Sequence, residues 1–219
     1  MGGSSSNANK VQQFNVFTKK LVYKSDMLTK KYWHSLCSVN SEIYSLGGNN
    51  GQAYFNDCQK YKISQNIWSK LPNLQCPRGA CASFSFNGRT IYVLGGCKNA
   101  GSDLDLMNTC EKLDIISERI WEYVMINNIF SPRQCIQAIS IAKGVVLLFG
   151  GYESESYTIE IKEKKMSCKK NSKMKEDCQF YNCSSPLYDG GCVFAVDYSH
   201  KIHKYSVNEK IWSIIKLLR

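Results

Sequence analysis

Three pairs of adjacent glycines recur along this chain, and their spacing constrains the fold more than any other sequence feature. Each pair ends a short apolar segment, and the first glycines of successive pairs are 48 and 55 residues apart. A basic residue stands 17 residues before each pair. A repeat of about 50 residues built from several short strands predicts a propeller of small sheets instead of one continuous sheet. The pairs are Gly47 and Gly48, Gly95 and Gly96, and Gly150 and Gly151, and the basic residues are Lys30, Arg78 and Arg133.

Residues 77–96 show how one repeat is built. Alternation over 80–86 predicts a strand, and Asn87 and Gly88 supply the two positive-φ positions of a tight hairpin turn. The apolar segment 91–94 then predicts an antiparallel strand that ends at the glycine pair. We expect the third and fourth strands of this unit at 110–115 and 120–124, and the same pattern to recur at Trp33, Cys135 and Cys192.

Tryptophans follow an aromatic or apolar residue at a regular distance. In two repeats a tyrosine precedes the tryptophan by seven residues, and in a third a leucine does so by eight. Together with the basic residue and the glycine pair, this pattern resembles the kelch repeat family, most strongly over 30–133. The resemblance implies a kelch-type β-propeller, in which glycines permit tight strand exits and tryptophans pack between blades. The pairs are Tyr61 with Trp68, Leu113 with Trp121, and Tyr205 with Trp212.

The repeat also predicts the domain organisation. Residues 1–9 contain no core-forming side chains and are expected to be a disordered tail. Residues 10–219 divide into units of about 10–29, 30–76, 77–131, 132–175 and 176–219. We therefore predict an all-β, partial kelch-type β-propeller of about four blades plus a half blade, with four short antiparallel strands per blade.

Three units depart from the pattern. The first supplies only the third and fourth strands of a blade, with Val16 and Tyr23 seven residues apart. In the unit 132–175, Cys168 stands where a tryptophan is expected. In the last unit, Asp197 and Tyr198 replace the glycine pair. A further pair precedes the apolar strand instead of ending it, namely Gly190 and Gly191.

A half blade at one end predicts an open arc. Unpaired strand edges are then expected near 11–17 and 211–218. Because an exposed edge offers unpaired backbone groups to another strand, self-association through the open edges, or a partner that donates strands, is expected.

Composition narrows the class of protein. The 219 residues carry a formal net charge of +10, which suits acidic partners or anionic surfaces. No run of 18 apolar residues and no secretory signal occur, so we expect a cytoplasmic protein. The 11 cysteines are an odd number, and we interpret them as reduced packing residues, Cys58 and Cys110 occupying the same repeat position. Zinc binding is the alternative, with Cys76 and Cys81 or Cys178 and Cys183 as candidate ligand pairs. Neither pair has a further cysteine or histidine at suitable spacing.

Lysines crowd into one short segment, with only Glu163 opposing them there. A solvated loop is the plainer interpretation, and contact with acidic protein, an anionic membrane surface or nucleic acid is the functional one. No aromatic residue is interleaved, which argues against nucleic-acid stacking. Gly2 fits the N-myristoylation pattern, so a lipid-anchored recruitment protein is the main alternative function. The cluster comprises Lys162, Lys164, Lys165, Lys169, Lys170, Lys173 and Lys175.

Residues for catalysis are sparse. The histidines, His34, His200 and His203, have no attendant carboxylate or nucleophile pattern in the sequence, and there is no phosphate-binding glycine loop. Asp103 and Asp105 are interpreted as parts of a solvated loop, with a calcium-binding site as the alternative. We predict no catalytic, cofactor or metal site, and a non-enzymatic protein-binding adaptor or scaffold, with an oxidase-like kelch enzyme as the least favoured alternative.

Overall fold

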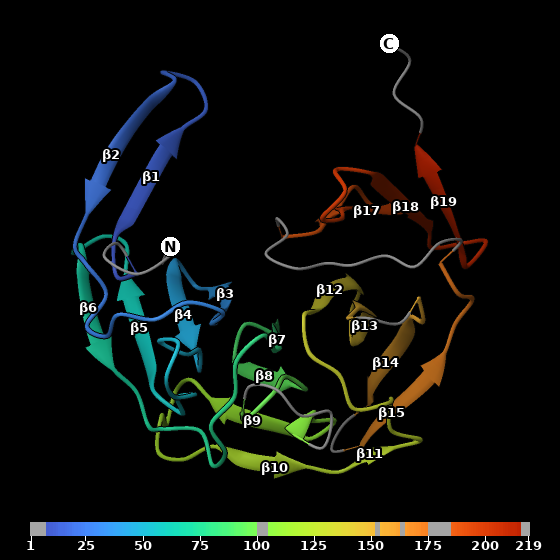
Figure 1. Cartoon of the computed structure of the whole chain (residues 1–219), viewed down its shortest axis with the longest axis horizontal. Coiled ribbons are helices and arrows are strands. Elements are labelled where there is room, and N and C mark those ends of the chain that lie inside the picture. The colour runs from blue at the N-terminus through green and yellow to red at the C-terminus, as the bar shows by residue number, and fades with distance from the viewer. Residues whose placement is uncertain (1–7, 100–104, 152–153, 163–164, 175–184, 216–219) are drawn as a thin grey trace.

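The computed structural model describes residues 8–99, 105–151, 154–162, 165–174 and 185–215, and its elements there are 19 β-strands. Most of them form antiparallel sheets arranged side by side around a common channel (Figure 1). The predicted all-β architecture with four strands per blade is confirmed. No α-helix occurs among the described residues.

Blades 1 and 2 are four-stranded sheets in which consecutive strands pair antiparallel from the channel outward. The hairpin turn at Asn87 and Gly88 is confirmed, because both residues have positive φ, 52° and 62°. Blade 1 contains β3 (Ser35–Val39), β4 (Glu42–Leu46), β5 (Cys58–Lys62) and β6 (Ile67–Lys70). Blade 2 contains β7 (Ala82–Phe86), β8 (Thr90–Leu94), β9 (Cys110–Asp114) and β10 (Glu122–Val124).

Blades 3 and 4 repeat this order, and blade 3 gains a short parallel strand at its outer edge. That added strand, β11 (Ile126–Asn127), comes from the connection between blades 2 and 3 and covers the edge of β15. Blade 3 otherwise contains β12 (Ile136–Ala142), β13 (Val145–Gly150), β14 (Tyr157–Lys162) and β15 (Lys165–Lys170). Blade 4 contains β16 (Leu187–Tyr188), β17 (Cys192–Val196), β18 (Ile202–Ser206) and β19 (Ile211–Ile215).

The first strands of blades 1 to 3 begin later than the sequence pattern predicts. Ala80 does not belong to β7, because its φ of 51° is left-handed and its N–H donates to the carbonyl of Trp33 in blade 1 at 2.7 Å. Cys135 repeats this geometry and donates to the carbonyl of Ala80 at 2.7 Å. These residues therefore join neighbouring blades instead of extending a strand.

The core lies between blades, where the face of one sheet packs on the next. Trp68, Trp121 and Trp212 each anchor their blade to the preceding unit through the indole N–H. Trp68 donates to the carbonyl of Ser25, and Trp121 donates to the carbonyl of Pro72, each at 2.9 Å. Trp212 donates to the Ser156 hydroxyl at 3.0 Å and packs on Phe149 of blade 3, with 5.1 Å between ring centroids.

The half blade consists of a single hairpin, β1 (Val11–Asn15) and β2 (Lys20–Lys24), whose strands pair with each other. The predicted match of Val16 and Tyr23 to a tyrosine–tryptophan pair is wrong by two residues. Phe14 faces Leu21 across the hairpin, as Tyr61 faces Trp68, and Val16 lies in the turn. The seven-residue spacing was correct, but it alone does not fix the register.

In blade 3, Cys168 takes the place of a tryptophan. Cys168 faces Ile159 across the strands, as Trp68 faces Tyr61 in blade 1. Ile159 therefore holds the tyrosine position, nine residues before Cys168. In blade 4, β17 ends immediately before Asp197, and Gly190 lies in the turn between β16 and β17. The interpretation of the displaced glycine pair was therefore right.

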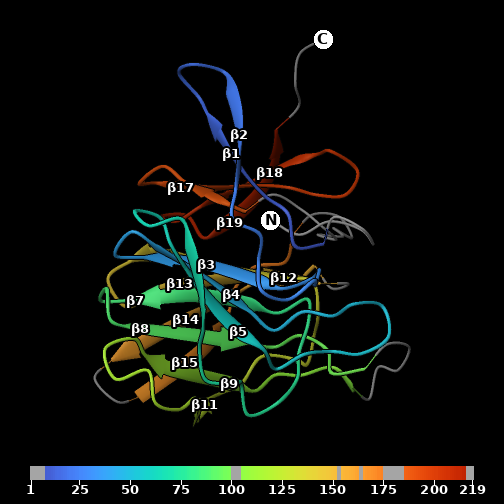
Figure 2. The same ribbon diagram turned by 90° about the vertical axis from the view of Figure 1, so that its left-hand side faces the viewer.

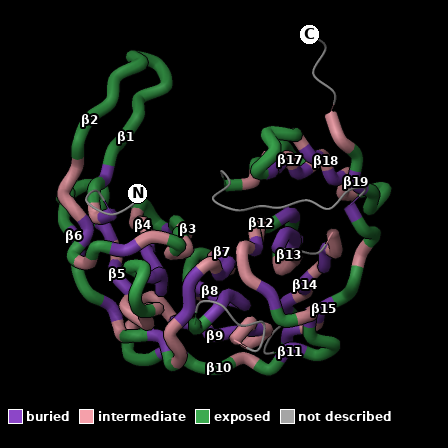
Figure 3. The backbone as a smooth tube through the Cα atoms, viewed as in Figure 1, coloured by how far each residue is buried: buried purple, intermediate pink, exposed green. Residues whose placement is uncertain are grey.

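The described strands form an open arc. The β1–β2 hairpin and the β17–β19 sheet lie on the two sides of its opening (Figure 1), and the hairpin projects beyond the blades (Figure 2). Most of the hairpin is exposed, whereas the blades have buried centres (Figure 3).

Candidate functional site

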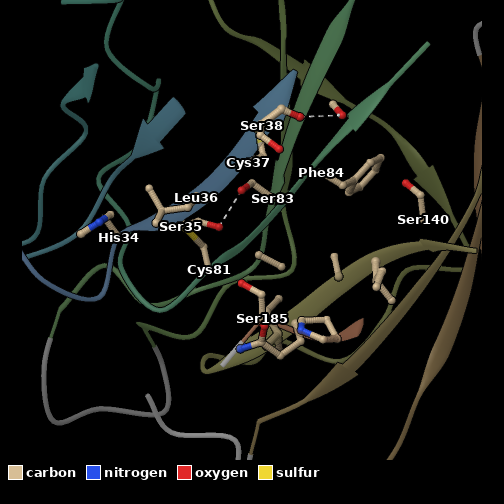
Figure 4. Close-up of a pocket in the computed structure, with 17 residues that line it drawn as sticks. His34, Ser35, Leu36, Cys37, Ser38, Cys81, Ser83, Phe84, Ser140 and Ser185 are labelled. Carbon is tan, nitrogen blue, oxygen red and sulfur yellow. Dashed lines mark hydrogen bonds between the residues drawn. The ribbon is translucent and has the colours of Figure 1, made fainter. Parts of the chain in front are cut away.

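The first strands of blades 1 to 3 border an open cavity of about 400 Å³ at the centre of the arc. It is lined by β3, β7 and β12, together with Ser185 and Pro186, which precede β16 (Figure 4). Because these strands are the innermost of their sheets, their channel-facing side chains can contact a ligand without disturbing the packing between blades. This channel is the candidate binding site.

Hydroxyl groups dominate the polar lining. Ser35 and Ser83 share a hydrogen bond of 2.7 Å across the boundary of blades 1 and 2, and the Ser85 hydroxyl donates to the carbonyl of Ser38 at 3.4 Å. Ser140 contributes a further exposed hydroxyl from blade 3 (Figure 4). No aspartate, glutamate, lysine or arginine is among the described residues of this lining.

The titratable groups of the channel are held uncharged. Burial, reinforced by the charge of Lys31, lowers the pKa of His34 to about 3, so the imidazole is neutral at physiological pH. Its Nδ1 atom is buried and has no hydrogen-bond partner among the described residues. Burial also raises the pKa of Cys37 to about 12 and that of Cys81 to about 11, which keeps both thiols protonated. The channel thus offers hydrogen bonds without net charge.

An exposed aromatic side chain stands at the start of β3. Trp33 is 44% exposed, directly precedes His34, and packs edge-on against Tyr32 with 5.7 Å between ring centroids. The corresponding residues of the next blades, Ala80 and Cys135, are small. Trp33 is not among the residues that line the channel, but its exposed indole combines apolar contact area with a hydrogen-bond donor, which is typical of protein-binding surfaces.

The basic residues of the repeat are structural. Arg78 is fully buried and forms a 2.6 Å ion pair with Glu111, while its other nitrogen donates to the carbonyl of Gly95 at 3.1 Å. Arg133 donates to the carbonyl of Gly150 and lies 4.9 Å from the centre of the Tyr157 ring.

In blade 1 the expected residue is wrong by one position. Lys30 is exposed, whereas Lys31 is fully buried and pairs with Asp57 at 2.9 Å. A lysine side chain has a different length from an arginine, so equal spacing to the glycine pair did not identify the buried cation.

The glycine pairs stand where a side chain would collide with neighbouring segments of the chain, the next blade for the first glycine and its own blade for the second. Gly47 has a φ of 62°, and an added Cβ would overlap the carbonyl oxygen of Arg78. At Gly96, with a φ of 95°, the Cβ would lie 2.6 Å from the carbonyl oxygen of Gly79. Both features require glycine at these strand exits.

Blade 4 replaces the glycine by Asp197, and the expectation that no histidine has an attendant carboxylate is wrong. The Asp197 carboxylate forms a 2.9 Å hydrogen bond with His203 Nε2, and both side chains are buried. Burial alone would raise the pKa of Asp197, but the hydrogen bonds from His203 and from the backbone of Lys201 outweigh it and hold the pKa below its usual value. Neither Asp197 nor His203 is among the residues that line the channel.

The lysine cluster is partly neutralised, which corrects the expectation that only Glu163 opposes it. Lys162 pairs with Glu160 at 2.9 Å, and Glu155 lies beside two further lysines. Those two are Lys170, in direct contact, and Lys173, at 4.0 Å. Lys165 and Lys169 are exposed on β15. Gly2, Glu163, Lys164 and Lys175 lie outside the described residues.

Other candidate groups have structural surroundings. Cys58 and Cys110 are buried, and burial raises the pKa of each thiol to about 12. Asp105 lies 3.6 Å from Lys98. Over the part of the chain that the structure describes, no group of three or more potential ligands could hold a metal ion, and no helix is long and apolar enough to cross a membrane. Outside those residues lie Asp103, Cys178 and Cys183.

The channel itself was missed by the sequence reasoning. A signal for it exists, because serines alternate along the first strands, at Ser83 and Ser85 in blade 2 and at Ser35 within blade 1. Alternate residues share one face of a strand. Only the arrangement of blades shows that these faces meet.

Four-stranded sheets arranged around one channel define a β-propeller, which is open in this structure. In three of the sheets a tryptophan hydrogen-bonds to the preceding unit. The family model of the KLHDC2/KLHL20/DRC7 Kelch-repeats domain matches residues 1–217. The chain belongs to this kelch repeat family, and it is a protein-interaction module.

Relatives carry kelch repeats in different contexts. The horsepox virus Kelch repeat and BTB domain-containing protein 2 is 25% identical over 72% of this chain and 29% of its own length. A putative F-box/kelch-repeat protein of Arabidopsis thaliana is 30% identical over 44% of this chain and 26% of its own. Rat Kelch domain-containing protein 10 is 25% identical over 68% of this chain and 39% of its own. The chain thus spans well under half the length of these relatives.

Proposed function

We propose that this chain is a non-enzymatic adaptor or scaffold that captures an uncharged polar segment of a partner protein in the channel. The observation that carries the proposal is the lining, in which seryl hydroxyls, a neutral His34 and protonated thiols leave no charge to attract a charged ligand. Exposed Trp33 supplies an apolar anchor at the start of β3. Two relatives combine kelch repeats with a BTB domain or an F-box in their names, which supports an adaptor role.

The same titration states favour binding over catalysis. A thiol with a pKa near 12 is a poor nucleophile, and an imidazole with a pKa near 3 is a weak base. The buried pair of Asp197 and His203 is not part of the lining. We therefore propose that the channel recognises its partner without transforming it.

Quantitative affinity purification with mass spectrometry tests this proposal. Trp33→Ala removes the aromatic anchor, and Ser140→Tyr introduces bulk into the channel from an exposed position. The matched control is Ile67→Ala, which changes an exposed apolar residue on the outer strand β6. We expect a common set of partners to be lost from both Trp33→Ala and Ser140→Tyr and retained by the control. Partners that bind all three variants equally would refute recognition in the channel.

The lipid-anchored alternative remains a hypothesis with its own test. A single myristoyl chain binds membranes only marginally, so Gly2 would need support from lysines, of which Lys165 and Lys169 are exposed. Flotation with anionic liposomes should then fall in the Gly2→Ala variant and at high salt. Flotation unaffected by Gly2→Ala would remove this alternative.

A further inference from the structure

Strand β1 exposes an unpaired edge that carries no charge. Its sequence is VQQFN, and among the described strands it pairs only with β2. Gln12, Gln13, Phe14 and Asn15 are all exposed. Natural proteins protect exposed edges with lysine, proline or a bulge, and β1 has neither residue type and a regular register with β2. This edge can therefore accept a further strand.

The charges of the hairpin lie on the other strand. Lys20 and Lys24 belong to β2, and Lys19 lies in the turn. A strand added beside β1 would be separated from these lysines by the width of β1. If that strand came from an identical hairpin, the β2 strands of the two hairpins would lie three strand spacings apart, about 14 Å. This exceeds the screening length of about 8 Å at physiological ionic strength.

One face of the hairpin is apolar and exposed. Phe14 pairs with Leu21, and Gln12 pairs with Tyr23, so these four side chains share a face. Phe14, Leu21 and Tyr23 are 54%, 53% and 69% exposed. Phe14 and Leu21 hold the positions of Tyr61 and Trp68, which are buried in blade 1. The half blade thus presents an interblade surface that no described element covers.

We propose that two copies of this chain associate through their β1 strands. The strands pair antiparallel about a two-fold axis at Gln13, which places Gln13 opposite its own counterpart and Gln12 opposite Phe14 of the second copy. The order β2–β1–β1–β2 completes a four-stranded antiparallel sheet, the size of blades 1, 2 and 4. This inference rests on the hairpin alone and is independent of the channel.

A second copy suits this edge better than an unrelated strand. A symmetric seam brings together two uncharged strands and keeps all lysines of both hairpins outside it. It also places the two Phe14 rings on one face, where diagonal neighbours in adjacent strands can touch. The hairpin projects away from the blades (Figures 1 and 2), which leaves room beyond its tip for the second molecule.

Charge substitution at the axis gives a specific test on the full chain. Gln13 is exposed, so Gln13→Lys and Gln13→Glu should leave the fold intact, as circular dichroism and thermal melts would show. The control is Ser69→Lys, on the exposed face of β6. Sedimentation velocity over about 1 to 100 µM covers the range expected for an interface of this small size.

We expect the wild type and the Ser69→Lys control to dimerise with increasing concentration. Each Gln13 variant alone should show a dissociation constant raised on the order of tenfold, because like charges meet at the axis. An equimolar mixture of the two variants should regain dimers, since opposite charges then face each other. A strictly monomeric wild type, dimers insensitive to Gln13→Lys, or a mixture that does not recover would each overturn the proposal.

Discussion

The guanidinium of Arg78 and the carboxylate of Glu111 lie 2.6 Å apart, and neither side chain has any exposed surface. The same arginine donates to the carbonyls of Gly95 and Thr109, and the carboxylate accepts the backbone N–H of Gln75 at 2.7 Å. The pair therefore fixes the exit of β8 in blade 2 and ties it to the segment that connects blades 1 and 2. Its removal should affect stability more than a surface charge would.

Arg78→Ala should lower the free energy of unfolding by roughly 3 to 5 kcal/mol, because Glu111 is then left as an unpaired buried charge. Denaturant midpoints measure the change. Arg89→Ala provides the matched control, because it removes an arginine from an exposed ion pair with Asp114 and should have little effect. Equal effects of the two substitutions would show that the buried pair does not stabilise the fold.

The interblade tryptophans should contribute strongly to stability. Trp68→Ala and Trp121→Ala should each cost roughly 3 to 5 kcal/mol, because each opens a large cavity in a buried cluster and removes an indole hydrogen bond. Lys169→Ala, on the exposed side of β15, should cost almost nothing. Chemical denaturation compares the three variants. Small and equal effects would place the tryptophans on a binding surface instead.

Stability should fall as the pH drops from about 6.5 toward 3, partly because of His34. The pKa of His34 has its ordinary value of 6.5 in the unfolded chain and is about 3 in the folded protein. Between these two pH values the unfolded chain therefore binds a proton that the folded chain does not. The neutral imidazole therefore favours the fold above pH 6.5, and this contribution is lost progressively on acidification.

The His34→Phe variant isolates that contribution from carboxylates that titrate in the same range. The difference in unfolding free energy between wild type and variant should change by roughly a few kcal/mol between these pH values. Urea titrations at a series of pH values measure it. A difference that stays constant with pH would show that the pKa of His34 is not lowered in the folded protein.

Buried thiols should resist alkylation in the native protein. At about pH 8 the thiolate population of Cys58 and Cys110 should be very small, because burial raises each pKa to about 12. Cys192 is only half-buried and should react faster than either of them. Peptide mapping after iodoacetamide treatment, with and without denaturant, follows each site. Native labelling of Cys58 as fast as Cys192 would contradict the structure.

Local sequence determined the strands and their turns. Asn87 and Gly88 adopt the positive φ values of a hairpin turn because asparagine tolerates that conformation and glycine has no Cβ to oppose it, whatever surrounds them. Period-2 alternation and the apolar run before Gly95 likewise placed β7 and β8 to within two residues. The tryptophans were expected between blades, since a large apolar side chain recurring once per repeat is stable there only when buried.

Tertiary structure decided the features that depend on residues far apart in the chain. Lys31, not Lys30, is the buried cation because only its ammonium reaches Asp57. Trp33 and Ala80 leave the strand conformation because a hydrogen bond joins them across 47 residues. The serine-lined channel forms where separate blades converge, and the exposed edge of β1 follows from its position at one end of the arc. Each depends on the packing of one blade against another, and a pattern within a single repeat carries no information about that contact.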